Sequence, residues 1–295
     1  MINRIYFILS MIIFGAIGVF AKLINLASDE IALYMSLIGS FFLLTIFICS
    51  KHPISIGNIK KNTFSLLVSS IALSGNWIFL FQSYKETTIA NAALSYYFAP
   101  VLVIVMSPIV LKERLSLKKV VCVCAGFIGL ICIVLSGGND GASHHLLGIF
   151  YGLVAAAFYA TLTLSNKFIR DLNGLENTLL QLLLSAALLI PYVLLTTGFL
   201  LFRISGYSVV IIVVLGVLHT GIGFYLFFSG MKGLKGQSIA VLSYIDPLTS
   251  LLISAFVFRE RMATFQIIGA VLLLGSTFIS EVRISPSVKK ILDRG

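Results

Sequence analysis

The sequence predicts an all-α membrane protein with ten transmembrane helices in an inverted five-plus-five repeat. The first observation is composition, because 59% of the 295 residues are hydrophobic and only 11% are charged. A soluble domain carries about 25% charged residues. The second is a series of apolar runs that are each long enough to cross a bilayer, which takes about 20 residues per helix. The third is a repeat that relates the two halves of the chain.

Ten apolar runs are separated by mostly short polar segments. The runs span residues 5–22, 31–50, 64–84, 89–110, 118–136, 147–168, 177–198, 207–230, 238–258 and 264–281. The first run resembles a signal peptide. It lacks a following small-residue cleavage pattern, so we expect it to be the first spanning helix. The glycine-rich, polar segment 137–146 is predicted to link the two halves.

The distribution of Lys and Arg defines an orientation. If both termini are cytoplasmic, 16 of the 21 Lys and Arg residues fall in cytoplasmic segments, as the positive-inside bias predicts. The outer segments then hold Lys22, Lys85, Arg203, Arg259 and Arg261. This bias accounts for the net charge of +10 without a nucleic-acid partner. We therefore expect a multi-pass protein of the cell (inner) membrane, with residues 282–295 as a cytoplasmic tail.

The fourth and ninth runs repeat a pattern of residues. Tyr97, Pro100, Ser107, Val110 and Glu113-Arg114 recur 147 residues later as Tyr244, Pro247, Ser254, Val257 and Glu260-Arg261. Each half therefore contains five runs, and an odd number makes the second half enter the membrane from the opposite side. Inverted repeats with helix-breaking residues at matching positions are typical of secondary transporters, whose binding site lies near the midplane between the halves.

These features resemble a known family. Each half has a mid-span proline in its fourth helix, then Lys112-Glu113-Arg114 or Arg259-Glu260-Arg261, then a glycine-containing last helix. This pattern resembles the EamA-type carriers of the drug/metabolite transporter superfamily. The resemblance implies two EamA-like repeats, residues 1–136 and 147–281, and both termini in the cytoplasm.

The resemblance also implies a general activity, which is the movement of small metabolites by alternating access, often as export. The substrates of such carriers include amino acids, sugars and nucleotide sugars. Phe14-Gly15 departs from the family's frequent tryptophan before the glycine of the first span.

Asp246 is the principal candidate site residue, because it is the only acid well inside a long apolar run. A charge near the bilayer centre costs at least ~2.5–3.5 kcal/mol on insertion scales, so the side chain is expected to face a water-filled cavity. There it can take up and release a proton, or pair with the amine of a substrate. Pro247 leaves the carbonyl of Ser243 as a free acceptor beside the acid. The structural alternative is an acid that is bonded to a hydroxyl on a neighbouring helix.

Five further residues are candidates for substrate binding, and each has a structural alternative. Tyr97 and Tyr244 are expected to approach one cavity from opposite sides, or to pack where their helices bend. Trp77 can form an aromatic wall by cation–π contact, or can pack in the core. Asn76 needs a hydrogen-bond partner wherever it points. His219 can exchange a proton with Asp246, or can form an interhelical hydrogen bond.

Charged residues at the ends of runs have simpler expected roles. Lys22 can snorkel to the surface or recruit an anionic group, and snorkelling is the favoured interpretation. Glu113-Arg114 and Glu260-Arg261 are expected to form local ion pairs that anchor their loops. The sequence shows no phosphate-binding loop, no His and Cys cluster for a metal, and no paired catalytic carboxylates.

We therefore predict a secondary transporter that moves a small organic metabolite, with an amino acid or related amine favoured. Its expected action is proton-coupled export at Asp246, without a cofactor, metal or catalytic residue, by a monomer or homodimer in the lipid bilayer. The first alternative is an uncoupled facilitator or exchanger of a sugar or another metabolite. The second is a membrane-embedded enzyme on a lipid-linked substrate, which needs two converging catalytic groups at one membrane face. The third is an assembly partner, which needs neither aligned helix breaks nor a buried acid.

Overall fold

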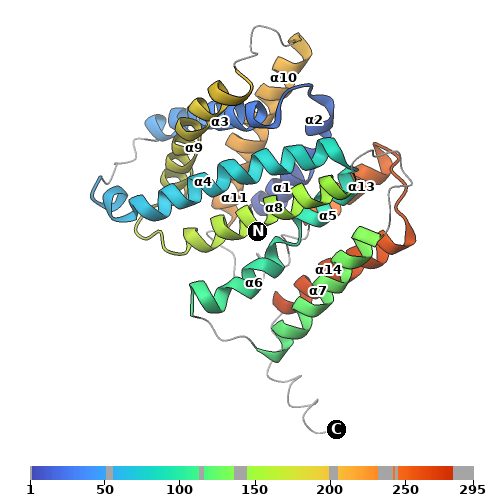
Figure 1. Ribbon diagram of the computed structural model, residues 1–295. Helices are drawn as coiled ribbons and strands as arrows, with labels where there is room; N and C mark the ends of the chain where they lie inside the picture. Colours follow the sequence, from blue (N-terminus) through green and yellow to red (C-terminus); the bar gives the residue numbers. More distant parts are fainter. Residues whose placement is uncertain are drawn as a thin grey trace.

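The computed structural model describes residues 2–50, 56–112, 116–135, 145–198, 205–231, 242 and 245–281. Within these ranges the chain is almost entirely helical and contains no strand (Figure 1). Eight helices or helix pairs are long and apolar enough to cross a membrane, and two further apolar helices are shorter. These are the ten transmembrane helices that the sequence predicts.

The first half of the chain forms spans one to five. They are α1 (Ile2–Gly15) with α2 (Ile17–Leu23), α3 (Ser28–Cys49), α4 (Ile56–Glu86), α5 (Ile89–Tyr96) with α6 (Ala99–Val110), and α7 (Leu117–Leu135). The second half forms spans six to ten. They are α8 (His145–Asn166), α9 (Gly174–Thr196), α10 (Gly206–Val214) with η2 (Leu215–Ile222) and α11 (Gly223–Met231), α13 (Ile245–Phe256), and α14 (Thr264–Glu281).

The predicted break in the fourth span is present. α5 ends at Tyr96 and α6 begins at Ala99, so Pro100 lies in the first turn of α6. A proline is tolerated there, because the first helical N–H groups have no partner within the helix. Two irregularities were not predicted. The first span is interrupted at Ala16, and η2 is a π-helical turn in the eighth span.

The pairing of helices follows the repeat. α4 packs on α8, and the equivalent helices of the other half, α11 and α1, pack on each other. α3 pairs with α9 and α7 pairs with α14, so each of these pairs joins equivalent spans of the two halves (Figure 1). Exchanging the two halves therefore maps the α4–α8 pair onto the α11–α1 pair, and maps the α3–α9 and α7–α14 pairs onto themselves. The pseudo-two-fold axis of an inverted repeat requires this pattern.

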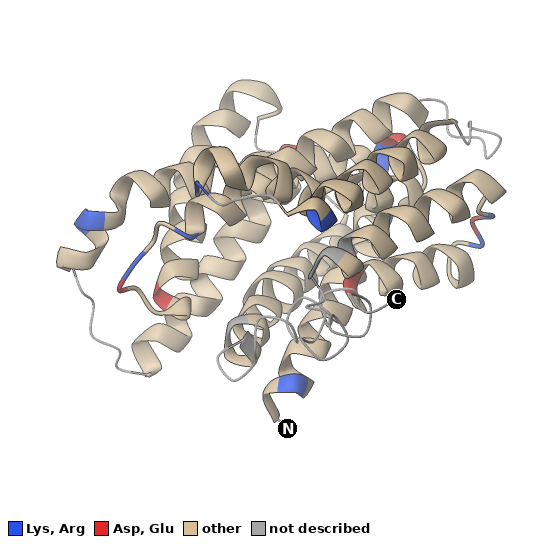
Figure 2. Cartoon of the chain, turned by 90° about the horizontal axis from the view of Figure 1, so that it is seen from below, with Lys and Arg blue, Asp and Glu red and all other residues tan. Residues whose placement is uncertain are grey.

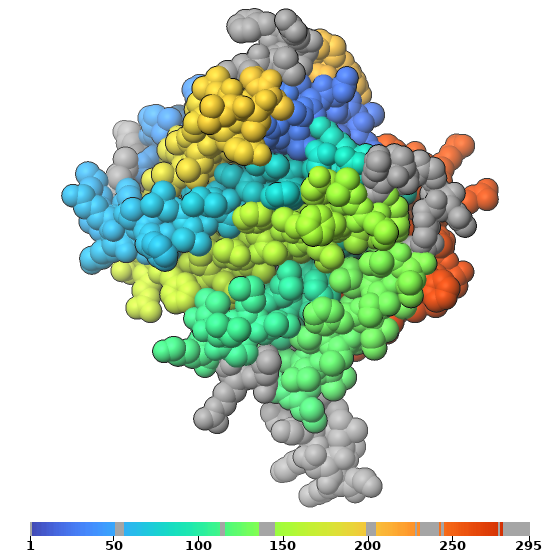
Figure 3. All heavy atoms as spheres, viewed as in Figure 1, coloured from blue at the N-terminus to red at the C-terminus, as the bar shows by residue number. Residues whose placement is uncertain are grey.

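The two halves are interleaved in space. In Figure 3, α9 and α8 lie on either side of α4, although they come from the other half of the sequence. Small residues permit some of the closest contacts. A Cβ atom on Gly129 of α7 would lie 2.8 Å from the carbonyl oxygen of Gly269 of α14, so these backbones touch directly, as is common between membrane helices.

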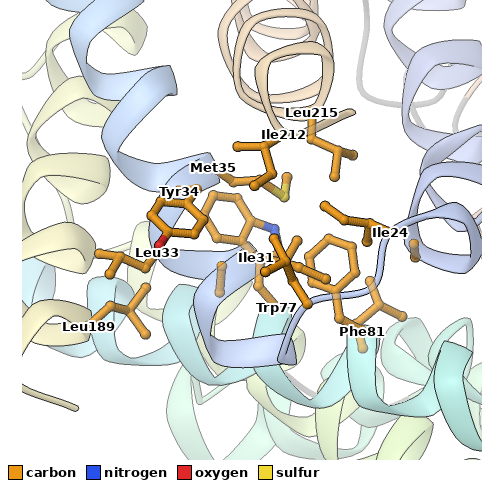
Figure 4. Packing of buried hydrophobic residues seen from close by; sticks show 14 of the residues in the cluster. Ile24, Ile31, Leu33, Tyr34, Met35, Trp77, Phe81, Leu189, Ile212 and Leu215 are labelled. Carbon is orange, nitrogen blue, oxygen red and sulfur yellow. The ribbon is translucent and has the colours of Figure 1, made fainter. Parts of the chain in front are cut away.

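The charged residues of the described chain are few and lie mostly near helix ends (Figure 2). Asp246 differs from the other acids, because it lies well inside an apolar run, 238–258, although it is in the first turn of α13. The largest apolar cluster is built around α3, α4 and the eighth span, and it includes Ile31, Met35, Trp77 and Ile212 (Figure 4). This cluster holds one part of the bundle together, while α13 packs on α1 and α5.

Candidate functional site

The candidate site lies where the break between α5 and α6 meets the first described turn of α13. Asp246 is in the first turn of α13, and its carboxylate accepts a hydrogen bond from the hydroxyl of Tyr97. Tyr97 lies in the break between α5 and α6. Both side chains are half-buried. The Tyr97–Asp246 bond therefore joins the fourth span of one half to the ninth span of the other.

Three more tyrosines surround this pair. Tyr84 of α4, Tyr96 of α5 and Tyr159 of α8 all interact electrostatically with the Asp246 carboxylate. The ring centroid of Tyr96 lies 5.5 Å from that of Tyr97 and 5.6 Å from that of Tyr159. We call Tyr84, Tyr96, Tyr97 and Tyr159 the tyrosine cluster.

Sequence analysis did not identify Tyr84 and Tyr159 as site residues. Tyr84 lies next to Lys85 at the end of its helix, where tyrosine is common simply because it prefers the membrane interface. Only the packing of α4 and α8 against each other brings these residues to one place.

No basic side chain pairs with Asp246 in the part of the chain that the structure describes. Tyr97 is its hydrogen-bond partner, and the other groups that interact with it electrostatically are tyrosines. The hydroxyl partner matches the structural alternative for an intramembrane acid, but one hydrogen bond does not neutralise a carboxylate. The arrangement can therefore accept a proton or an organic cation.

A close approach of backbones fixes α13 beside the first span. A Cβ atom on Gly15, at the end of α1, would lie 2.5 Å from the carbonyl oxygen of Asp246 and 2.7 Å from Cβ of Thr249. Only glycine allows this separation. The first span also packs against the tyrosine cluster. A Cβ atom on Gly18 of α2 would lie 3.1 Å from the ring of Tyr84.

Trp77 and Asn76 have mainly structural surroundings. The side chain of Trp77 is 5% exposed, and Figure 4 shows it among apolar side chains that include Met35 and Ile31. This position favours core packing over an aromatic wall. Asn76 has the partner that it was expected to need, because its Nδ2 donates to the carbonyl oxygen of Ala155 on α8 at 2.9 Å.

His219 lies in the π-helical turn η2 and is buried. Its ring packs edge-on against Phe20, with centroids 4.9 Å apart. The Val214 carbonyl is nearby, but neither ring nitrogen has a hydrogen-bond partner of ordinary geometry among the described residues. Neither the predicted interhelical hydrogen bond nor a direct bond to Asp246 is therefore present in the described chain.

Of the two site residues predicted in the ninth run beside Asp246, only Pro247 lies within the described residues. Pro247 is in the first turn of α13 and is buried. Tyr244 lies outside the described residues, so its approach to the site opposite Tyr97 stays a prediction. Ser243 and Glu113-Arg114 also lie outside the described residues.

The expectation of a local ion pair at Glu260 needs correction. Its carboxylate accepts hydrogen bonds from the backbone N–H of Ile89 at 3.0 Å and of Ala90 at 3.3 Å. Glu260 therefore caps the start of α5, which lies in the other half of the chain. The ammonium of Lys22 donates to the carbonyl oxygen of Thr87 at 2.8 Å, so this lysine binds backbone rather than only extending to the surface.

Ten helices in an inverted repeat, with the break of the fourth span beside an acid of the ninth apolar run, define a membrane transporter. The model of the EamA-like transporter family matches the chain twice, over residues 2–135 and 146–281. The chain therefore belongs to the EamA-like transporter family, which the sequence pattern had suggested.

Curated relatives cover nearly all of the chain. The chain is 31% identical to the uncharacterized transporter YxxF of Bacillus subtilis over 280 residues, covering 94% of this chain and 88% of that protein. It is 29% identical to an uncharacterized transporter of Archaeoglobus fulgidus over 274 residues, covering 92% and 94%. One solved crystal structure is similar with a TM-score of 0.66 at 17% identity, over 99% of this chain and 98% of that one. At that identity it supports the fold alone.

Proposed function

We propose that this protein exports a small organic amine, such as an amino acid or a related compound, in exchange for protons that Asp246 carries. The observation that carries this proposal is the Tyr97–Asp246 pair, where the break of the fourth span meets the first turn of α13. A carboxylate in the membrane is costly unless it is paired. A proton and an ammonium group are alternative ways to neutralise it, so their binding at one carboxylate is mutually exclusive.

The tyrosine cluster supports an amine as the substrate. Aromatic faces attract cations, by about 0.5–1 kcal/mol at exposed sites and about 2 kcal/mol or more when the cation is desolvated. Four tyrosines around one carboxylate therefore favour an organic cation over a neutral sugar.

The protein is proposed to lie in the inner membrane, with both termini in the cytoplasm. This placement is supported by the distribution of Lys and Arg. It is also supported by a relative in Salmonella typhimurium, 23% identical over 282 residues, which is named an uncharacterized inner membrane transporter, YicL. The direction of transport follows from the family resemblance.

An uncoupled facilitator or exchanger is the second candidate. The observation that favours it is the Tyr97–Asp246 hydrogen bond itself. A carboxylate that already accepts a hydrogen bond from a hydroxyl can stay deprotonated and select an amine without taking up a proton in each cycle.

The test uses purified protein in liposomes with an imposed pH gradient. Internal pH and solute content are followed while panels of amino acids and amines are added, for the native protein and for Asp246→Asn. Asp171→Asn is the matched control. Asp171 lies in the connection between α8 and α9 at φ 61°, a backbone conformation that asparagine also tolerates.

We expect an amine to move protons with the native protein, and Asp246→Asn to abolish proton movement and to weaken amine binding, because both ligands use the same carboxylate. If solute moves without protons and the variant no longer binds it, Asp246 serves selectivity and the protein is an uncoupled carrier. If Asp246→Asn behaves as the native protein does, the acid is structural and the proposal is wrong.

A further inference from the structure

The two half-helices at the site are held together at both ends. α5 starts at Ile89 and is followed by Tyr97, while α13 begins with Asp246 in its first turn and is followed by Glu260. Tyr97 contacts Asp246, and Glu260 contacts Ile89. The two helices therefore run antiparallel, with one polar contact between the end of α5 and the start of α13 and another between the start of α5 and the segment after α13.

The contact between the start of α5 and the segment after α13 is built by the backbone as well as by side chains. Arg259 adopts a left-handed conformation, with φ 53°, immediately before Glu260. The Glu260 N–H donates to the carbonyl of Ser254 at 3.1 Å, and the Ser254 hydroxyl donates to the Glu260 carboxylate. These contacts fold Glu260 back over the end of its own span and direct its carboxylate at α5. Lys112, at the equivalent position of the other half, also has a positive φ of 56°.

A basic residue of the first span completes the arrangement. The Lys22 ammonium binds the Thr87 carbonyl, directly before α5, and attracts the Glu260 carboxylate electrostatically. The start of α5 is thus bound by the first span and by the segment after α13. We call Glu260, Ser254, Lys22 and the backbone of Thr87, Ile89 and Ala90 the outer latch.

We propose that Glu260 is a positioning residue for transport, because it keeps the outer side of the pathway closed by holding α5 against the end of α13. This proposal rests on the proposed orientation, in which the outer latch faces away from the cytoplasm. Opening toward the outside requires α5 and α13 to separate. Such a movement breaks the bonds of Glu260 to Ile89 and Ala90, so Glu260 shifts the equilibrium toward the outwardly closed state.

Hydrogen bonds that involve a charged acceptor are about twice as strong as neutral ones. Glu260→Gln keeps the shape of the side chain but removes its charge and one of its two acceptor oxygens. The variant is expected to remain folded, because α5 is also held by the Gln266 amide of α14, which donates to the side-chain oxygen of Asn91 at 2.7 Å.

The test measures access to the site rather than transport. Ser250 is buried on α13, one turn beyond Asp246 on the side of the outer latch. Ser250→Cys is introduced after the native cysteines have been replaced by alanine; these are Cys49, Cys122, Cys124 and Cys132. A membrane-impermeant maleimide is then applied to intact cells and to inside-out vesicles, with and without Glu260→Gln.

Glu86→Gln is the matched control. Glu86 is an acid at the same end of the bundle, and it accepts a hydrogen bond from Gln82 of its own helix at 2.9 Å. Correct folding of every variant is checked by gel filtration in detergent. Ser254→Ala, which removes only one bond to the Glu260 carboxylate, is a milder second variant.

We expect Glu260→Gln to raise the labelling rate of the Ser250→Cys protein from the outer face about tenfold, which corresponds to about 1.4 kcal/mol. Ser254→Ala should raise the rate by a smaller factor, and Glu86→Gln should leave it unchanged. If the rate stays the same in folded Glu260→Gln and Ser254→Ala, or rises equally in Glu86→Gln, the proposal is overturned. A rise that occurs only in inside-out vesicles supports the latch and overturns the proposed orientation. The test does not require the substrate to be an amine.

Discussion

At the scale of single residues, the environment of an acid decides what it can do. Asp246 has a hydroxyl donor in Tyr97 and tyrosines around it, but no basic partner within the described chain. Asp29, by contrast, lies at a helix start and accepts hydrogen bonds from the hydroxyls of Thr196 and Thr197 at 2.7 and 3.0 Å. Asp29 also has a basic neighbour, because it interacts electrostatically with Lys85, whereas Asp246 has no such neighbour among the described residues.

The role of the Tyr97 hydroxyl leads to a prediction. Tyr97→Phe retains the ring but removes the donor to Asp246, and a hydrogen bond to a charged group contributes about 1.5–3 kcal/mol. We expect kcat/KM for amine transport in liposomes to fall at least about tenfold, with an unchanged melting temperature or a small decrease. Tyr192→Phe is the control, because Tyr192 is an exposed residue of α9. Equal transport by Tyr97→Phe and the native protein would show that this bond has no part in the cycle.

At the scale of helices, the breaks and the close contacts position the site. The break between α5 and α6 releases Tyr97 from regular helical geometry, and the glycine at the end of α1 lets the backbone of α13 approach. The π-helical turn η2 places His219 inward without a hydrogen-bond partner in the described chain. π-helical turns often occur at functional sites, but the geometry here assigns no proton path through His219.

The contact between α1 and α13 leads to a prediction about Gly15. Gly15→Val places carbon atoms where the carbonyl of Asp246 and the side chain of Thr249 already lie, so α13 must move. Overpacking of this kind costs about 1–3 kcal/mol. We expect a lower melting temperature in detergent and a loss of most transport activity.

Gly57→Val is the control for Gly15→Val. Gly57 lies in the first turn of α4, and a Cβ atom there would have no neighbour within 4 Å. A Gly15→Val protein with native stability and transport would contradict the close packing of α1 on α13.

At the scale of the whole molecule, the exchange of equivalent helices between the halves is the main organising feature. Tyr97 and Asp246 both belong to the fourth span of their repeat, and the outer latch joins the end of one such span to the start of the other. Alternating access in inverted-repeat transporters is largely a movement of one repeat against the other around a fixed site. Contacts that cross between the halves are therefore where such a movement is controlled.

The proposed orientation gives a prediction for the whole chain. Fluorescent-protein fusions at either terminus should fluoresce, because these proteins fold in the cytoplasm. Alkaline phosphatase inserted within residues 137–146 should be active, because that linker follows an odd number of spans and lies outside. The reciprocal fusions are the controls: phosphatase at the termini should be inactive, and fluorescent protein in the linker should be dark. The opposite pattern would reverse the orientation and the assignment of the outer latch.

The sequence alone determined the class of fold, the number of spans and the repeat, and it predicted Asp246 as the candidate acid. Hydrophobic length, the positions of Lys and Arg, and recurring prolines follow from the bilayer and the backbone, so they are visible without tertiary contacts. Only the tertiary structure placed Trp77 in the core, brought Tyr84 and Tyr159 to Asp246, and directed Glu260 to α5. These contacts join spans that are distant in the chain, and the face that each helix presents depends on which helices pack against it.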